Sequence, residues 1–547
     1  MEATLLPSTR FLPTLTTMKC SLTGSQLING QWVATGAKTM RGSNPATGEA
    51  LDPRFAPASE AEVDAAMQAA AEAFKITREL PPATRAQLLE TIAARIMDLG
   101  DDLLRRANLE TGLPLPRLIG ERARTCGQLQ LFADLIREGS WVDAVIDTAD
   151  PQRQPLPKPD LRRMARPLGP IVVFGASNFP FAYGACGGDT ASALAAGNPV
   201  VVKAHERHPS VNELFAHAVR AALQDCNLPP GVFNLLQGPG ATVGQALTKH
   251  PATQAVGFTG SKRAGRALFD LAAARSSPIP VYAEMGSLNP FVLLPGALAE
   301  RSEPIAAGLA QSIAAGGGQF CTKPGLVFVV GAAAAETFVA QLASQLAGVP
   351  PATMIAVEMQ QNFCATTGAF QKIPGVWTRL ANSPTGFAAM PPILLEVDSA
   401  TWREQLGLHE EAFGPGALVI RCPDFTDLIE TVSCAGGNLT AALHYGAADS
   451  STEVRAVAQA LEQLAGRVVF NGYPTGVEVG RAMVHGGPYP ATTAPSTTSV
   501  GILAIQRFVR PVCFQNAPDA LLPAELQNAN PRQLWRTVNG ERTKQAL

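Results

Sequence analysis

The chain has 547 residues, of which 46 % are hydrophobic and only 16 % charged, so extensive disorder and a small disulfide-stapled fold are both excluded. Its 43 Lys and Arg residues against 45 Asp and Glu residues give a net charge of −2, so no basic excess points to a nucleic-acid partner. The longest apolar run, Leu326 to Ala335, is far shorter than the roughly 20 residues that cross a bilayer, so no membrane partner is expected.

The N-terminal segment does not have the pattern of a secretory signal. It carries Glu2 where such a signal needs positive charge, and Arg10 and Pro13 interrupt any apolar core. We therefore expect residues 1–17 to form a disordered extension before Met18. The nine cysteines are scattered and never in C-x-x-C spacing, which is typical of reduced thiols in the cytoplasm. No metal site is expected, because the seven histidines include no H-E-x-x-H pair.

Helical spacing dominates the first part of the chain. Apolar residues recur every three or four positions from Ala61 to Arg137, which predicts a helical N-terminal layer. A stretch rich in proline and charge, Asp150 to Arg166, then predicts a linker or crossing arm.

Strands and helices alternate from Gly169 to Gly286. Short Val-, Ile- and Phe-rich runs are separated by helices at Asp189 to Ala196, Ser210 to Asp225, from Thr242 and at Ser261 to Ala274. The strands are GPIVVFGA, PVVVKA, GVFNLLQG, AVGFTG and PVYAEMG. This alternation predicts a parallel sheet covered on both faces, with ligands bound beyond the carboxyl ends of its strands.

A second alternating region follows and ends near Pro490, which predicts a second α/β domain. Its strand candidates are GLVFVVG, PPILLEV, ALVIRC, LTAALHYG and GRVVFNG. The tail contains SVGILAIQRFVRPVCFQ, which includes an extended apolar segment that we expect to add to a sheet of a neighbouring subunit.

Three residues are candidates for chemistry. Cys321 lies in the glycine-rich string GGGQFCTKPG, so it is either a nucleophile or one buried cysteine among nine. Glu284 ends an apolar strand, where a lone carboxylate either has a functional task or a partner or reaches solvent. Asn178 follows a strand and either donates to an oxyanion or merely favours the turn.

Other residues are candidates for ligand binding. Lys203 closes a strand, where it binds a ribose or phosphate or caps the strand in solvent. Gly260, Ser261 and Gly265 open a helix and suggest a pyrophosphate site at its N-terminus, although the string is not G-x-G-x-x-G. Glu411 in HEEAFGPG is a ligand or a loop carboxylate.

The combination of these strings resembles the aldehyde dehydrogenase superfamily, from about Met18 onward. It is carried by FGASNFP, VVVKAHERHPS, GFTGSKRAG, YAEMGSLNP, GGGQFCTKPG and EEAFGPG, in that order. NPATGE, GERARTCGQLQLF, RPLGPIVVFGASNFPF, NGYPTGVEV and HGGPYPAT further resemble the branch of α-ketoglutarate semialdehyde (2,5-dioxovalerate) dehydrogenases.

The resemblance implies an α/β fold with a Rossmann-type parallel-sheet cofactor domain, an α/β catalytic domain and a small oligomerisation arm. By this likeness residues 18–143 and 167–286 form the NAD(P)-binding domain and 287–490 the catalytic domain. Residues 144–166 and 491–547 form the arm and tail, and the protein is a homodimer or homotetramer in the cytoplasm.

The resemblance also implies a mechanism for a small aldehyde substrate. The Cys321 thiolate forms a thiohemiacetal whose oxyanion is held by Asn178, and Glu284 activates the water that releases the acid from the thioester. Glu411 and Phe413 hold the nicotinamide side of the cofactor, Lys203 the adenosine ribose, and the helix opened by Ser261 the pyrophosphate.

The cofactor is NAD or NADP, with NAD favoured. Glu206 would repel a 2′-phosphate, whereas His205, Arg207 and His208 would offset its charge. For the substrate carboxylate, Arg124 is the candidate reader, and the alternative is a surface pair with Glu121. Phe179 forms the wall of the substrate tunnel or belongs to the core.

Three departures from the branch affect these expectations. Lys323 stands where the branch usually has Asn, and either assists the thiol or faces outward. Ser496 stands where Arg is expected, which removes a carboxylate contact. The region from Pro351 to Pro374 fits poorly and is expected to form surface structure.

Three rival interpretations stay open. One is an aldehyde dehydrogenase of broader or different semialdehyde or fatty aldehyde specificity. Another is a hydrolase that uses Glu284, Lys203 and Cys321 without nicotinamide, and a third is a protein that only binds dinucleotide.

Overall fold

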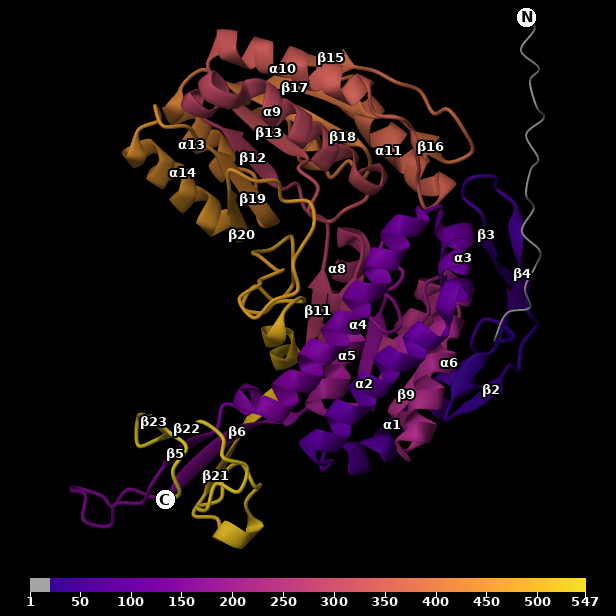
Figure 1. Ribbon diagram of the computed structural model, residues 1–547, viewed down its shortest axis with the longest axis vertical. Coiled ribbons are helices and arrows are strands. Elements are labelled where there is room, and N and C mark those ends of the chain that lie inside the picture. Colours follow the sequence, from indigo (N-terminus) through magenta and orange to yellow (C-terminus); the bar gives the residue numbers. More distant parts are fainter. Residues whose placement is uncertain (1–19) are drawn as a thin grey trace, which may run out of the picture.

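The computed structural model describes residues 20–547, which form two lobes and an arm that projects from one side (Figure 1). The extension expected for residues 1–17 lies outside the described residues. No described helix is long and apolar enough to cross a membrane.

The first lobe contains the predicted parallel sheet. Its strand order is β11-β10-β7-β8-β9-β1-β2, with β7 to β11 parallel and β1 and β2 added antiparallel at one edge. The bounds are β7 Ile171–Phe174, β8 Val200–Lys203, β9 Phe233–Leu236, β10 Ala255–Thr259, β11 Val281–Glu284, β1 Gln26–Ile28 and β2 Gln31–Val33. All five predicted strands are confirmed, whereas β1 and β2 are too short to show a pattern in the sequence.

Helices cover both faces of this sheet because alternate side chains of each strand point to opposite sides. Ile171 and Val173 pack with helices α2 to α6, whereas Val172 and Phe174 pack with α1, α7 and α8. The bounds are α1 Glu60–Thr77, α2 Pro82–Asp98, α3 Gly100–Thr111, α4 Leu115–Glu138, α5 Gly188–Ala196, α6 Pro209–Asp225, α7 Gln245–Lys249 and α8 Lys262–Ala273. The predicted helical layer corresponds to α1 to α4.

The second lobe is a further α/β unit, as predicted. Its sheet has the order β15-β17-β18-β13-β12-β19-β20, and only β15 is antiparallel to its neighbour. The strands are β12 Pro290–Leu293, β13 Leu326–Val330, β15 Val376–Leu380, β17 Ile393–Asp398, β18 Gly416–Cys422, β19 Asn438–His444 and β20 Ala465–Phe470. Helices α9 Pro295–Ala314 and α10 Ala332–Ala347 cover one face. The other face carries α11 Val357–Phe370, α12 Ser399–Glu404, α13 Phe425–Ser433 and α14 Ser451–Leu464.

The arm is a five-stranded sheet of order β21-β6-β5-β22-β23, drawn at the lower left of Figure 1. Its strands are β5 Val145–Asp147, β6 Leu161–Pro167, β21 Val509–Gln515, β22 Arg536–Val538 and β23 Glu541–Thr543. The extended segment expected in the tail is β21, and its pairing with a neighbouring subunit stays a prediction. Residues Ile502–Phe508 form a 3-10 helix buried against α4 and α5, and β21 pairs with β6 of its own chain.

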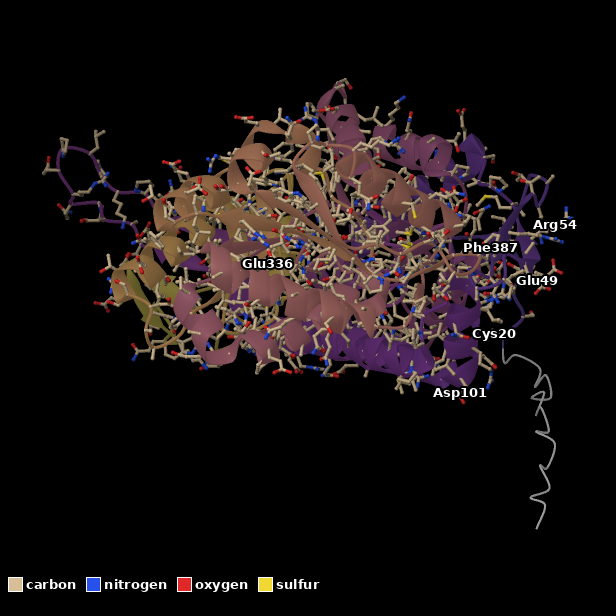
Figure 2. All side chains as sticks on the ribbon, turned by 90° about the horizontal axis from the view of Figure 1, so that it is seen from above. Cys20, Glu49, Arg54, Asp101, Glu336 and Phe387 are labelled. Carbon is tan, nitrogen blue, oxygen red and sulfur yellow. The ribbon has the colours of Figure 1, made fainter. Side chains whose placement is uncertain are left out.

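A hairpin near the N-terminus contacts the second lobe. It is formed by β3 Met40–Ser43 and β4 Ala50–Phe55 and reaches the loop before β16 Ala389–Met390, which pairs with β14 Ala352–Thr353. A side chain at Gly48 would meet the ring of Phe387 at 2.6 Å, and Figure 2 shows Phe387 beside Glu49 and Arg54. The first strands of the chain therefore contact the second lobe.

Candidate active site

Cys321 follows a stretch of backbone whose conformation favours glycine. Gly316, Gly317 and Gly318 have φ values of +57°, +67° and +68°, in the left-handed region. A Cβ atom at Gly318 would lie 2.1 Å from the backbone of Gly414, so the glycine run lets the cysteine loop pack directly on the loop that follows Glu411. The two glycine-rich strings of the sequence thus meet in space.

Two buried amides hold the cysteine loop. The Asn178 amide donates to the carbonyl of Gln319 at 2.7 Å, and the Asn289 amide donates to the carbonyls of Cys321 and Lys323 at 2.8 and 2.9 Å. Asn178 lines the same cavity as Cys321, and its amide carries a second hydrogen. It is therefore placed both to support the loop and to donate to an oxygen near Sγ.

Two cavities meet at Cys321. The first has a volume of about 390 Å³ and lies at the carboxyl ends of the strands of the first lobe. The second has a volume of about 470 Å³ and lies against α4. Both cavities are lined by Phe179, Tyr183 and Cys321. The thiol can therefore contact a ligand in either cavity.

A histidine links Cys321 to Glu284. The Nε2 atom of His485 lies 3.3 Å from Sγ of Cys321, and its Nδ1 atom lies 3.3 Å from Oε2 of Glu284. Glu284 and His485 are only 3 % and 2 % exposed. The sequence analysis missed His485, because nothing distinguished it from the other histidines except its place in the string HGGPYPAT.

The partly buried Glu411 and the buried Lys323 form a second set of charged groups beside the first cavity. Burial raises the pKa of Glu411 to about 7, against the opposing charge of Lys323. Burial likewise lowers the pKa of Lys323 to about 8, and its Nζ donates to the carbonyls of Ala412 and Gly416. The expectation that Lys323 faces outward was wrong, since its ammonium is buried among backbone carbonyls on the Glu411 side, and its effect on the thiol stays a prediction.

The expected cofactor residues divide into two groups. Gly260, Ser261, Glu411 and Phe413 line the first cavity, and Ser261 caps the N-terminus of α8. The remaining three do not line it. Gly265 packs against Met285. Nζ of Lys203 lies 3.0 Å from Oε1 of Glu206, and the same oxygen accepts a hydrogen bond from the N–H of Gly240.

Helix α11 contributes to the first cavity as well. Met359, Asn362 and Thr366 of this helix lie among its lining residues. Residues 351–374, expected to form surface structure, therefore also help to enclose the cavity. The poor match of this region to the branch concealed its position over the cavity.

The expected substrate residues lie around the second cavity. Arg124 lines it and donates through NH1 to the carbonyl of Val477, whereas Glu121 accepts from the N–H groups of Phe181 and Ala182. The surface pair of these two residues is thus not formed. Phe179 lies edge-on to Phe320, with ring centroids 5.0 Å apart.

Arg117 was not predicted. Its guanidinium lies over the rings of Phe179 and Phe320 at 4.9 and 4.8 Å, and NH2 donates to the carbonyl of Asn178 at 2.6 Å. It therefore ties Asn178 to the cysteine loop. Ser496 is exposed and lines neither cavity, so the missing arginine at that position removes no contact from the described site.

A comparison with known protein families identifies the family of this chain. The model of the aldehyde dehydrogenase family matches residues 32–488, which include most of both lobes and all of the residues described above as lining the two cavities. The chain belongs to the aldehyde dehydrogenase family. It is an enzyme of that family, and the hydrolase interpretation finds no support, because Lys203 pairs with Glu206 and lines neither cavity at Cys321.

Relatives of this aldehyde dehydrogenase cover almost its whole length. It is 48 % identical over 526 residues to alpha-ketoglutaric semialdehyde dehydrogenase 2 of Azospirillum brasilense, with 95 % of this chain and 99 % of the relative covered. It is 42 % identical over 523 residues to the alpha-ketoglutaric semialdehyde dehydrogenase of Acinetobacter baylyi, with the same coverage. The fold is similar to that of a solved 1-pyrroline-5-carboxylate dehydrogenase from Thermus with bound NAD, with a TM-score of 0.75 at 22 % identity, over 90 % of this chain and 92 % of the other.

Proposed function

We propose that this aldehyde dehydrogenase oxidises α-ketoglutarate semialdehyde (2,5-dioxopentanoate) to 2-oxoglutarate with NAD or NADP. The observation that carries the proposal is the position of Cys321 at the junction of two cavities. One cavity is bordered by the strand ends of the first lobe, and the other is bordered by arginines of α4.

Cys321 is the proposed nucleophile. Its sulfur bonds to the aldehyde carbon, and the displaced electron pair becomes an oxyanion that accepts from the Asn178 amide and the Cys321 backbone N–H. The protein then holds a thiohemiacetal and, after oxidation, a thioester. Glu284 takes a proton from the water that attacks the thioester, and the acid leaves.

The first cavity fits a nicotinamide dinucleotide. It contains the N-terminus of the 12-residue helix α8 for the pyrophosphate, and the Glu411 carboxylate lies against the backbone of Gly286, close to Met285 and Glu284. We propose that Glu411 and Phe413 hold the nicotinamide ribose side and that Lys203 and Glu206 hold the adenosine ribose. When bound, nicotinamide supplies the acceptor for a hydride.

We propose NAD as the preferred cofactor. Glu206 is held at the strand end by Lys203 and by the N–H of Gly240, and its carboxylate would repel a 2′-phosphate. The two neighbouring histidines add no positive charge that would offset this repulsion, because burial lowers the pKa of both His205 and His208 and keeps them neutral. Lys203 is engaged by the Glu206 carboxylate, and Arg207 is the cation that lines this part of the cavity.

The second cavity fits an aldehyde with a carboxylate at its far end. Arg117 and Arg124 both line it, and burial raises the pKa of Glu121, which weakens the opposing negative charge. The Nε and NH1 atoms of Arg117 are buried and have no hydrogen-bond partner among the described residues. We propose Arg124 as the reader of the carboxylate, with Arg117 beside it and Phe179 as the wall.

The remaining parts have proposed roles as well. Residues 18–143 and 167–286 bind the cofactor, 287–490 carry the cysteine, and 144–166 with 491–547 assemble a homodimer or homotetramer. The nine cysteines are all free, which suits the reducing cytoplasm.

The test is NAD(P)H formation by the purified protein. Substrates are α-ketoglutarate semialdehyde, succinate semialdehyde, glutaraldehyde and an alkyl aldehyde, each with NAD and with NADP. The proposal predicts the highest kcat/KM for the keto-acid aldehyde, and a loss of about 10- to 100-fold in Arg124→Ala for that substrate alone. Equal turnover of the uncharged aldehydes would refute the named substrate.

A further inference from the structure

The imidazole of His485 is the only polar group of the described residues recorded as hydrogen-bonded to Sγ of Cys321. The backbone of His485 is held by two hydrogen bonds, since its N–H donates to Thr498 Oγ1 at 2.8 Å and its carbonyl accepts from the N–H of Ser499 at 2.8 Å. The ring itself is held toward the thiol by contacts at both nitrogens, with Cys321 at Nε2 and with Glu284 and Ser499 at Nδ1.

The partners of Nδ1 determine which ring nitrogen carries the hydrogen, and therefore whether Nε2 can accept the proton of the thiol. Nδ1 lies 3.3 Å from the Glu284 carboxylate and 3.1 Å from the Ser499 hydroxyl. An ionised carboxylate only accepts, and the Ser499 hydroxyl donates to the carbonyl of His485 at 3.2 Å, so both groups favour a hydrogen on Nδ1. The lone pair of a neutral ring is then on Nε2, directed at Sγ.

The charged and titratable groups around the ring favour its protonated form. They are Glu284 on β11, Cys321 on its loop, and Tyr183, whose ring centroid lies 6.0 Å away, while Arg467 on β20 interacts with Cys321 and Tyr183. Burial by itself lowers the pKa of His485, but Tyr183, Cys321 and Glu284 raise it well above its usual range. A proton taken by this ring is therefore stabilised.

We propose that His485 is the base that activates Cys321, and that Glu284 holds it in the tautomer required. The S–H bond breaks with its electron pair left on sulfur, an N–H bond forms at Nε2, and the Glu284 carboxylate balances the imidazolium. When hydrolysis of the thioester releases the thiolate, the ion pair forms again without another proton transfer. This inference rests on the proposed role of Cys321 as nucleophile.

The test measures the reactivity of the thiol without substrate or cofactor. The rate of alkylation of Cys321 by iodoacetamide is followed from pH 5 to 9.5 by mass spectrometry of the peptide that contains it. The wild-type rate should stay nearly flat down to about pH 6. In His485→Gln the rate at pH 7 should fall at least about tenfold, and the half-maximal rate should move to higher pH.

Matched variants separate this role from a structural one. His444→Gln removes another buried histidine, on β19 outside both cavities, and should overlay the wild type. Glu284→Gln keeps the shape but removes the charge, so its profile should shift in the same direction by less. If His485→Gln does not fold, the shift of the Glu284→Gln alkylation profile decides whether His485 activates Cys321.

Superimposable alkylation profiles for wild type and a folded His485→Gln would overturn the inference. This outcome is independent of the substrate, because alkylation needs no aldehyde. Failure of the proposed function would instead appear as normal alkylation together with no turnover of α-ketoglutarate semialdehyde.

Discussion

Cys321 lies at the end of the first cavity, so its chemistry can be separated from cofactor binding. Cys321→Ala should reduce aldehyde oxidation by at least about 10³-fold, because no other described cysteine lines either cavity. The affinity for NADH, measured by fluorescence titration, should change less than about twofold. Turnover near the wild-type rate would show that another group carries the reaction.

Glu411 and Lys323 should make stability depend on pH in a characteristic way. The pKa of Glu411 is raised from 4.5 to about 7, so the folded state loses stability as pH rises through that interval. The pKa of Lys323 is lowered from 10.5 to about 8, so stability is recovered as pH rises from about 8 to 10.5. The two groups therefore destabilise the folded state most between about pH 7 and 8.

The double variant Glu411→Gln with Lys323→Met removes this dependence. Its Tm minus that of the wild type should rise from pH 4.5 to 7, reach a maximum near pH 7 to 8 and fall again toward pH 10.5. The same double exchange at the exposed pair Glu72 and Lys75 is the control. A difference that is constant with pH would contradict the assignment of the two groups.

At the scale of elements, the glycine run before Cys321 sets the position of the thiol. Gly318→Ala should lower kcat/KM at least about tenfold and destabilise the fold by more than the roughly 1 to 2 kcal/mol expected for a left-handed alanine, because its Cβ also meets Gly414. Gly100 has a similar φ of +61° and nothing within 4 Å of its Cβ position. Gly100→Ala should therefore destabilise the fold only by the amount expected for a left-handed alanine, and it should leave kcat unchanged. Tm and steady-state rates measure the two effects.

The same elements indicate how far sequence reasoning reaches. The strands β7 to β11 and their helices were predicted, because a buried parallel strand has a strong local signal of apolar residues between turns. In the tail, the extended segment was predicted, but the 3-10 helix at Ile502–Phe508 was not, because that helix is set by contacts with α4 and α5 and not by local pattern.

In the active site as well, sequence reasoning did not find the residues whose roles depend on distant parts of the chain. Cys321, Glu284 and Asn178 lie in strings that a resemblance can match, and the structure brings Cys321 and Glu284 within reach of one histidine. His485, Lys323 and Arg117 could not be assigned, because their roles depend on residues more than 60 positions away in the chain. Long-range contacts of this kind leave no periodicity in the sequence.

At the scale of the whole molecule, the arm leaves a five-stranded sheet with two free edges, β21 and β23, away from the lobes (Figure 1). Unpaired strand edges favour pairing with another chain. We therefore expect light scattering to give a mass of about two or four times 57.3 kDa. A mass of a single chain at micromolar concentration would contradict the proposed role of the arm.

The most direct test of the central claim, that Cys321 carries the reaction as a thioester, uses Glu284→Gln. This variant is mixed with α-ketoglutarate semialdehyde and NAD, quenched within one turnover and digested for mass spectrometry. The account predicts a burst of NADH of about one per active site, a slow phase after it, and the acyl group on the peptide that contains Cys321. A burst with no adduct on that peptide, or steady turnover without a burst, would contradict it.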